Sequence, residues 1–216
     1  MIPMVIDLHS ILLRIPAAFF ALVLHEAVKA RCSTMLGDPS PRNAGLMTGN
    51  LMKYIEPIGF ILAVVFGFGW GRPTPTAPMY YKDVKKGIFI TYLTPSLVNM
   101  AVGLSMGLVV GILNVALAPA VGAAGDLAAT LVYWLFRFLL AFSLMSVSIA
   151  LFNMIPVPPL DAAKLLQSAL SPNTAVKMTQ NEKVLQIVLM LLTVMGLIGA
   201  VIQPIAANLV NAAFTF

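Results

Sequence analysis

Four apolar runs, each long enough to cross a bilayer, constrain this chain more than any other feature of its sequence. They cover residues 11–28, 88–117, 127–154 and 184–214. A helix needs ~20 apolar residues to cross the ~30 Å hydrocarbon core, where only helices and closed barrels satisfy their backbone polar groups. We therefore predict an all-α polytopic membrane protein with four full spans.

The low charge content supports lipid-facing helices. Charged residues make up 10% of the 216 residues and hydrophobic ones 60%, whereas a soluble domain carries ~25% charged residues. The formal charge of +5 fits basic loops on one side of a membrane. No basic patch is interleaved with aromatic residues, so we expect the lipid bilayer and no nucleic acid as partner. Residues 1–216 are expected to form a single membrane-embedded domain whose first span is retained, because no signal-peptide pattern precedes it.

A fifth apolar run, residues 58–68, is short and rich in glycine. If it crossed the membrane, the basic loops before and after it would lie on opposite faces, against the positive-inside rule. If it is re-entrant or a short helix, residues 29–86 and 155–183 lie on the same side of the membrane. These two segments contain every lysine and arginine except Arg14 and Arg137. We predict this arrangement, in a bacterial inner membrane, with the N-terminus outside and both segments in the cytoplasm.

The segment 45–59, with the sequence GLMTGNLMKYIEPIG, combines turn residues with short apolar pieces. This pattern is typical of extended pieces joined by turns, so we expect a small β-hairpin-like element. Non-helical backbone at membrane depth is tolerated only where it is buried in protein or lines a wet cavity. A cavity is therefore expected beside the inner end of the first span.

Two arginines lie inside the predicted spans. Arg14 is near the outer end of the first span, where we expect it to snorkel to the interface. Arg137 lies deeper in the third span and needs a partner, for which Asp126 and water are the candidates.

Three ionisable side chains are predicted at one membrane face. His25 and Glu26 lie near the inner end of the first span, and Asp161 follows prolines that break the chain after the third span. Charged groups in a span cost ~3 kcal/mol when they face lipid, so these are expected to face a cavity or one another. A histidine ligand, a carboxylate as the second ligand and a glutamate that activates water are the parts of a zinc hydrolase site.

The residues that flank these three extend the pattern over about residues 15–165. They are Ile15-Pro16, Leu36-Gly37-Asp38-Pro39, Thr48, Asn50, Pro57-Ile58-Gly59, Phe68-Gly69-Trp70, Pro73, Pro75, and Asn153 through to Asp161. With them, the chain resembles the site-2-protease family of intramembrane zinc metalloproteases, in its short bacterial form without a PDZ domain.

The resemblance implies a zinc cofactor held by His25 and Asp161, with Glu26 as the catalytic base. It also implies that Trp70 and Asn153 line the substrate path. The substrate or partner would be a membrane-spanning segment of another protein.

Lys29 departs from the family pattern at the site itself. The motif His-Glu-x-x-His places a second zinc ligand one helical turn after the first, and this chain has lysine there. Only a neutral amine binds zinc, and deprotonating an ordinary lysine at pH 7 costs ~4 to 5 kcal/mol. Neither His9 nor Cys32 can replace the missing ligand, because they lie ~24 Å and ~10 Å from His25 along a continuous helix. We predict weak or lost catalysis, with the Lys29 ammonium in the cation's place between the carboxylates.

Three functions stay open on the sequence. The chain is an intramembrane metalloprotease that works despite Lys29, a non-catalytic relative (a pseudoprotease) that binds membrane segments in the substrate groove, or a transporter. A buried charged cluster fits a transporter, but the sequence has no inverted repeat or pair of broken helices. The resemblance favours the protease class, and the residues at the site favour weak or lost catalysis within it.

Overall fold

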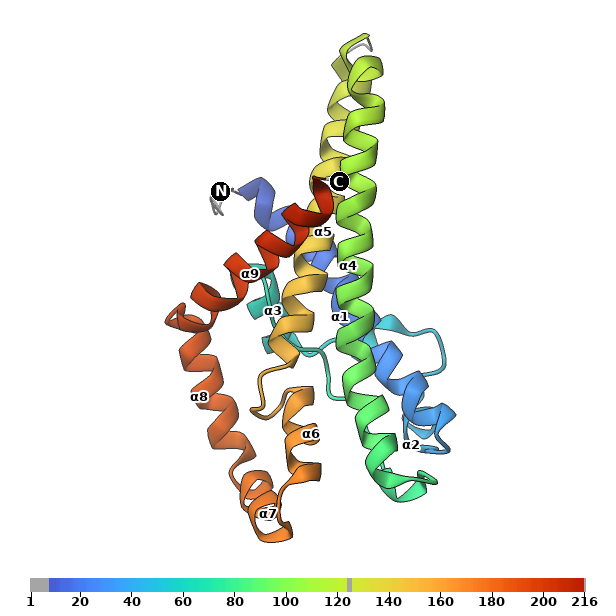
Figure 1. Ribbon diagram of the computed structural model, residues 1–216, viewed down its shortest axis with the longest axis vertical. Helices are drawn as coiled ribbons and strands as arrows, with labels where there is room; N and C mark the ends of the chain where they lie inside the picture. The colour runs from blue at the N-terminus through green and yellow to red at the C-terminus, as the bar shows by residue number, and fades with distance from the viewer. Residues whose placement is uncertain (1–7, 124–125, 216) are drawn as a thin grey trace.

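The computed structural model describes residues 8–123 and 126–215 as a bundle of helices (Figure 1). The helices are α1 (Leu8–Met35), α2 (Ser40–Asn43), α3 (Pro57–Phe66), α4 (Val84–Ala123), α5 (Asp126–Asn153), α6 (Asp161–Ala169), α7 (Pro172–Gln180), α8 (Glu182–Val194) and α9 (Leu197–Phe214), with short 3-10 helices η1 (Leu51–Tyr54) and η2 (Pro78–Tyr80). Helices α1, α4, α5 and α9 are long and apolar enough to cross a membrane. The prediction of an all-α polytopic protein with four spans is confirmed.

The antiparallel pair of α4 and α5 forms the centre of the bundle (Figure 1). Gly103, Gly107 and Gly111 lie one turn apart on one face of α4. A Cβ at Gly103 would overlap the carbonyl oxygen of Ser143 in α5, and one at Gly111 would overlap that of Phe214 in α9. Small residues let helix backbones approach each other in lipid, where no hydrophobic effect drives helices together. This stripe of glycines therefore sets how α5 and α9 pack on α4.

Helix α1 packs against both α4 and α5 along a seam of small residues. Ala17, Ala18 and Ala21 are fully buried and share a core cluster with Met145 and Ile149 of α5. Because the alanines bring α1 close to its neighbours, the polar residues that follow them are carried into the interior of the bundle and away from its surface.

The short apolar run forms α3, which has ten residues and is too short to span. Arg14 Nη1 of α1 donates to Val65 O at 3.1 Å, and Gln203 Nε2 of α9 donates to Phe66 O at 2.7 Å. These donors satisfy carbonyls at the C-terminal end of α3, where a positive charge is also favourable. The predicted short fifth helix is confirmed. The expectation that Arg14 snorkels is wrong, because its side chain is buried against α3.

The expected β-hairpin-like element at 45–59 is wrong, because the described residues contain no strand. Gly45 and Gly49 take positive φ values of 69° and 78°, so the chain turns twice within five residues. The Asn50 side chain then accepts a hydrogen bond from Met52 N and starts η1. Local side-chain capping and glycine turns replaced the strand pairing that the pattern suggested.

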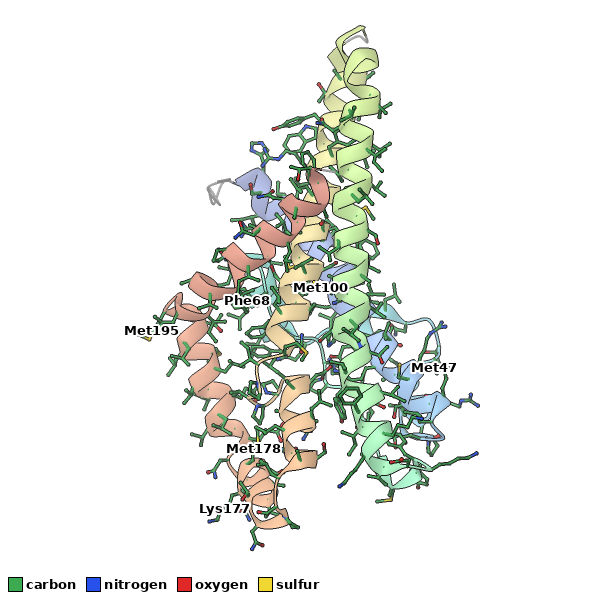
Figure 2. The ribbon with its side chains drawn as sticks, in the orientation of Figure 1. Met47, Phe68, Met100, Lys177, Met178 and Met195 are labelled. Atoms are coloured by element: carbon green, nitrogen blue, oxygen red, sulfur yellow. The ribbon has the colours of Figure 1, made fainter. Side chains whose placement is uncertain are left out.

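The apolar run 184–214, expected as one span, is divided into α8 and α9 at Gly196. This glycine adopts a left-handed conformation with a φ of 79°, and it directly precedes α9. Figure 2 labels the exposed Met195 at the outer edge of the bend. Helix α9 alone is the span, and α8 contacts the bundle near its own C-terminal half, where Leu189 joins Phe68 and Phe152 in a buried cluster.

The segments that carry most basic residues lie at one end of the molecule (Figure 1). Helix α1 ends there, α4 and α8 begin there, α2, α6 and α7 lie there, and α5 ends above α6. The basic segments before α4 and after α5 therefore lie toward the same end of the bundle. Arg137 lies toward the opposite end, where it donates to Tyr133 Oη at 2.9 Å and to Ser10 Oγ at 3.2 Å. The side chain of Asp126, the partner expected from the sequence, lies outside the described residues.

Candidate functional site

His25, Glu26, Lys29 and Asp161 form a buried cluster where α1 passes the start of α6. His25 Nε2 lies 3.0 Å from Asp161 Oδ2. Lys29 Nζ lies 2.7 Å from Glu26 Oε1 and 2.7 Å from Asp161 Oδ1. All four side chains are at most 5% exposed. The ammonium thus bridges two carboxylates that come from distant parts of the sequence.

The local geometry of two segments creates this cluster. His25 and Lys29 are four residues apart on α1, so they point from the same face. Asp161 is the first residue of α6, and the chain reaches it through an irregular segment, 154–160, that contains three prolines. Because proline cannot continue the α5 helix, the chain turns and brings the Asp161 carboxylate back against α1.

One ammonium is shared by the two carboxylates of the cluster. Burial alone would favour the neutral carboxylic acid, but the Lys29 ammonium and the His25 hydrogen bond hold the pKa of Asp161 below its ordinary value. Glu26, on the other side of the ammonium, accepts from the same Nζ. A buried charge without a partner would be unstable, so each of the three charged groups depends on the other two.

Glu26 also receives hydrogen bonds from the extended segment 68–77. Thr74 N lies 3.1 Å and Thr74 Oγ1 2.8 Å from Glu26 Oε2. Gly71, three residues earlier, passes so close that a Cβ there would lie 2.6 Å from Glu26 Cγ. With Lys29 on Oε1 and Thr74 on Oε2, both oxygens of Glu26 are engaged, and its carboxylate is held in one orientation.

Asn99 of α4 indicates which nitrogen of His25 carries the proton. Asn99 Nδ2 donates to Ala21 O at 3.2 Å and lies 3.5 Å from His25 Nδ1. An amide nitrogen facing Nδ1 requires Nδ1 to be the acceptor, so in the neutral ring the proton sits on Nε2. Nε2 then donates to Asp161, and its lone pair is not free.

The residues expected on the substrate path lie beside the charged cluster. Trp70 and Asn153 line a small cavity of about 60 Å³ together with Glu26, Lys29 and Asp161. Trp70 stacks on Phe152 with ring centroids 6.3 Å apart, and Asn153 Nδ2 donates to Ile149 O at 3.0 Å. The structure therefore brings five of the six candidate residues to one cavity, with His25 directly behind Asp161.

Sequence reasoning did not place Thr74 or Tyr92 at the site. Thr74 contacts Glu26 directly, and Tyr92 of α4 lines the same cavity while its hydroxyl pairs with Thr76 Oγ1 at 2.6 Å. The one available signal for Thr74 was its place between Pro73 and Pro75, since prolines on both sides favour an extended chain that exposes its backbone N–H. No sequence signal identified Tyr92.

The donors of this cluster do not fit a catalytic zinc. Such a site uses three protein ligands and an open position, but the described part of the chain holds no group of three or more His, Cys, Asp and Glu side chains that could bind a metal ion. His25 and Asp161 bond each other, and the third position holds an ammonium, which has no lone pair. No chemical step through zinc follows from this arrangement.

Comparisons with known proteins identify relatives over most of the chain. The sequence model of the family described as Peptidase family M50 matches residues 15–198. The chain is also 28% identical over 187 residues to a protein of Bacillus subtilis (strain 168) named "Putative zinc metalloprotease YwhC", covering 85% of this chain and 81% of that one. No solved structure matches the chain. The family match covers most of α1, all of α4 and α5, and both halves of the charged cluster, and the chain therefore belongs to peptidase family M50, the site-2-protease family.

Proposed function

We propose that this protein is an intramembrane-metalloprotease-like protein in which zinc catalysis is weak or lost and the substrate site serves to bind membrane segments of other proteins. The observation that carries the proposal is the position of Lys29 Nζ, 2.7 Å from both Glu26 Oε1 and Asp161 Oδ1. In this reading the ammonium supplies the positive charge that a metal supplies elsewhere in the family.

The charge of the ammonium opposes metal binding in two ways. A divalent cation and an ammonium in the same place repel each other, and their repulsion is strong where water is excluded. The site would also have to release the Lys29 proton, which both carboxylates stabilise. Metal binding at His25 and Asp161 would therefore cost the energy of breaking the existing cluster.

Glu26 is also poorly placed to act as a base in this arrangement. A general base must accept a proton from water, but Glu26 already accepts from Lys29 and from Thr74 on its two oxygens. Neither oxygen of Glu26 is therefore left without a donor that a water molecule would have to displace.

A binding role fits the parts of the site that remain. Trp70 and Phe152 form an aromatic wall, and Asn153 adds an amide near the cavity. The large apolar side chains of α8 are mostly exposed, including Val184, Ile187, Val188, Leu191 and Val194. An apolar helix of another membrane protein is the partner that this combination favours.

The alternative is a weakly active zinc protease. It is favoured by the relative in Bacillus subtilis that is named "Putative zinc metalloprotease YwhC", which aligns over 81% of its length. On either reading we place the charged cluster on the cytoplasmic side of a bacterial inner membrane, because the loops at that end carry the basic residues.

The experiment compares wild type with Lys29→His in liposomes that contain a panel of single-span membrane proteins. We expect no cleavage by wild type, zinc-dependent cleavage by Lys29→His, and crosslinks from wild type to at least one span through a photoreactive group near Trp70. A double variant, Lys29→His with Glu26→Gln, controls for contaminating proteases. Zinc-dependent cleavage by wild type would overturn the proposal in favour of the active protease.

A further inference from the structure

A second cavity lies on the other side of the segment that covers Glu26. Its volume is about 310 Å³, at the lower end of the range for small-molecule sites. Its lining consists of Ala44, Leu46, Lys53, Arg72, Pro73 and Pro75. Two cations and no acidic side chain line this cavity, whereas the smaller cavity beside Glu26 is lined by side chains of both charges.

The chain holds the two cations on neighbouring backbone segments. Arg72 N donates to Tyr54 O at 2.8 Å, which places Arg72 beside the residue that follows Lys53. Lys53 Nζ donates to Gly45 O at 3.2 Å, so the Lys53 side chain lies against the turn at Gly45. Within residues 8–123 and 126–215, neither cation has a carboxylate within 4.0 Å. Their positive charges are therefore available to an anion.

The position of the cavity indicates the membrane interface. Lys53 precedes α3 by four residues, and α3 exposes Ile58, Ile61 and Val65 at helical spacing, as a helix that faces lipid does. Exposed apolar side chains also lie in the loop itself, at Met47, Leu51 and Met52. Figure 2 shows Met47 on the opposite side of the molecule from α8. Cations beside exposed apolar side chains are the combination that an anionic lipid requires.

We propose that this cavity binds the phosphate group of an anionic phospholipid, with Arg72 and Lys53 on the phosphate oxygens and the acyl chains along Met47, Met52 and α3. Arginine pairs with phosphate through two parallel N–H donors. The Arg72 side chain is exposed and makes no described hydrogen bond, since only its backbone N donates, to Tyr54 O. The bound headgroup would lie next to Pro73 and Pro75, which flank the threonine that holds Glu26.

The test uses the full chain in detergent and counts bound lipids by native mass spectrometry. Wild type is titrated with phosphatidylglycerol, with phosphatidylcholine, and with inorganic phosphate as competitor. We expect one phosphatidylglycerol to bind more tightly than phosphatidylcholine. Arg72→Gln should weaken it about fivefold, and Arg72→Gln with Lys53→Gln about 25-fold, since each basic residue contributes ~1 kcal/mol to such binding.

The matched control is Lys85→Gln with Lys86→Gln, which removes the same charge from exposed positions at the same end of the molecule but outside the cavity. It should change phosphatidylglycerol binding by less than about twofold. Equal weakening by the control, or wild-type-like binding by Arg72→Gln, would overturn the proposal. Competition by millimolar inorganic phosphate would show that the free anion suffices, and its failure to compete would assign the site to the lipid.

Discussion

Lys29 and Asp161 form an ion pair that joins α1 to the first residue of α6, with Nζ 2.7 Å from Oδ1. Glu26 lies at the same distance from the same nitrogen. The cluster therefore contains its own cation, and the two carboxylates that family membership would assign to metal chemistry share the ammonium of one side chain.

Replacing Lys29 with methionine should destabilise the protein by about 3 to 5 kcal/mol, because it leaves two carboxylates buried without their common partner. Unfolding in detergent, followed by far-UV circular dichroism, measures this loss. Lys86→Met at an exposed site is the control and should change stability by at most ~0.5 kcal/mol. Adding Asp161→Asn to Lys29→Met should restore part of the loss; equal stability of Lys29→Met and the control would show that the ion pairs are not stabilising.

Replacing Thr74 with valine should cost about 1.5 to 3 kcal/mol, because the hydroxyl donates to a buried carboxylate while valine keeps the same shape. The backbone bond from Thr74 N remains, so the fold should persist. Thr179→Val, at an exposed site where the hydroxyl bonds only Ala175 O, serves as the comparison. If both variants melt together, Thr74 does not hold Glu26 in the way described.

The sequence was sufficient to predict the parts of the fold that depend on long-range hydrophobicity. Span lengths and basic loops predicted the four spans, the short α3 and the meeting of His25 with Asp161 at one end. Each of these follows from the cost of placing polar groups in lipid, which depends on composition over many residues.

The parts that failed depend on local backbone conformation. Gly45, Gly49 and Gly196 take left-handed conformations that end or turn elements, and a glycine in a sequence does not reveal whether it does so. The contact of Thr74 with Glu26 depends on the path of an irregular segment that has no periodicity to interpret. Arg14 was misplaced because the sequence does not show that the C-terminal end of α3 lies beside it.

The Asp38 carboxylate should make the stability of the protein depend on pH in the acid range. Although burial opposes its charged form, hydrogen bonds from Ser33 Oγ, Ser40 N and Ala77 N hold the pKa of Asp38 below its ordinary 3.8. A depressed folded-state pKa stabilises the protein above the unfolded-state pKa, and this contribution is lost as pH falls through the folded-state value.

Melting temperatures of wild type and Asp38→Asn should therefore differ most above about pH 4 and converge at lower pH. Glu182→Gln, a change of the same kind at the start of α8, controls for the general effect of losing one negative charge. A gap between wild type and Asp38→Asn that stays constant down to about pH 2 would contradict the assignment.

Replacing Gly59 with alanine should destabilise the protein by about 1 to 3 kcal/mol and move Trp70, because the added Cβ would overlap the carbonyl oxygen of Trp70. Thermal unfolding measures the first effect and tryptophan fluorescence the second. Gly199→Ala in α9 is the matched control, since its nearest neighbour would lie 3.6 Å away, and it should be neutral or stabilise by up to ~1 kcal/mol. Similar loss in both variants would mean that α3 and the Trp70 segment are not closely packed.

The zinc content of the purified wild-type protein tests the central claim most directly. Protein prepared with zinc in all buffers is passed through a desalting column and analysed by elemental mass spectrometry, with Lys29→His as the positive control and His25→Ala as the negative one. Because the ammonium occupies the position between Glu26 and Asp161, wild type should carry no more zinc than His25→Ala, and added zinc should not raise its melting temperature. One zinc per wild-type chain that is lost in His25→Ala would contradict the account.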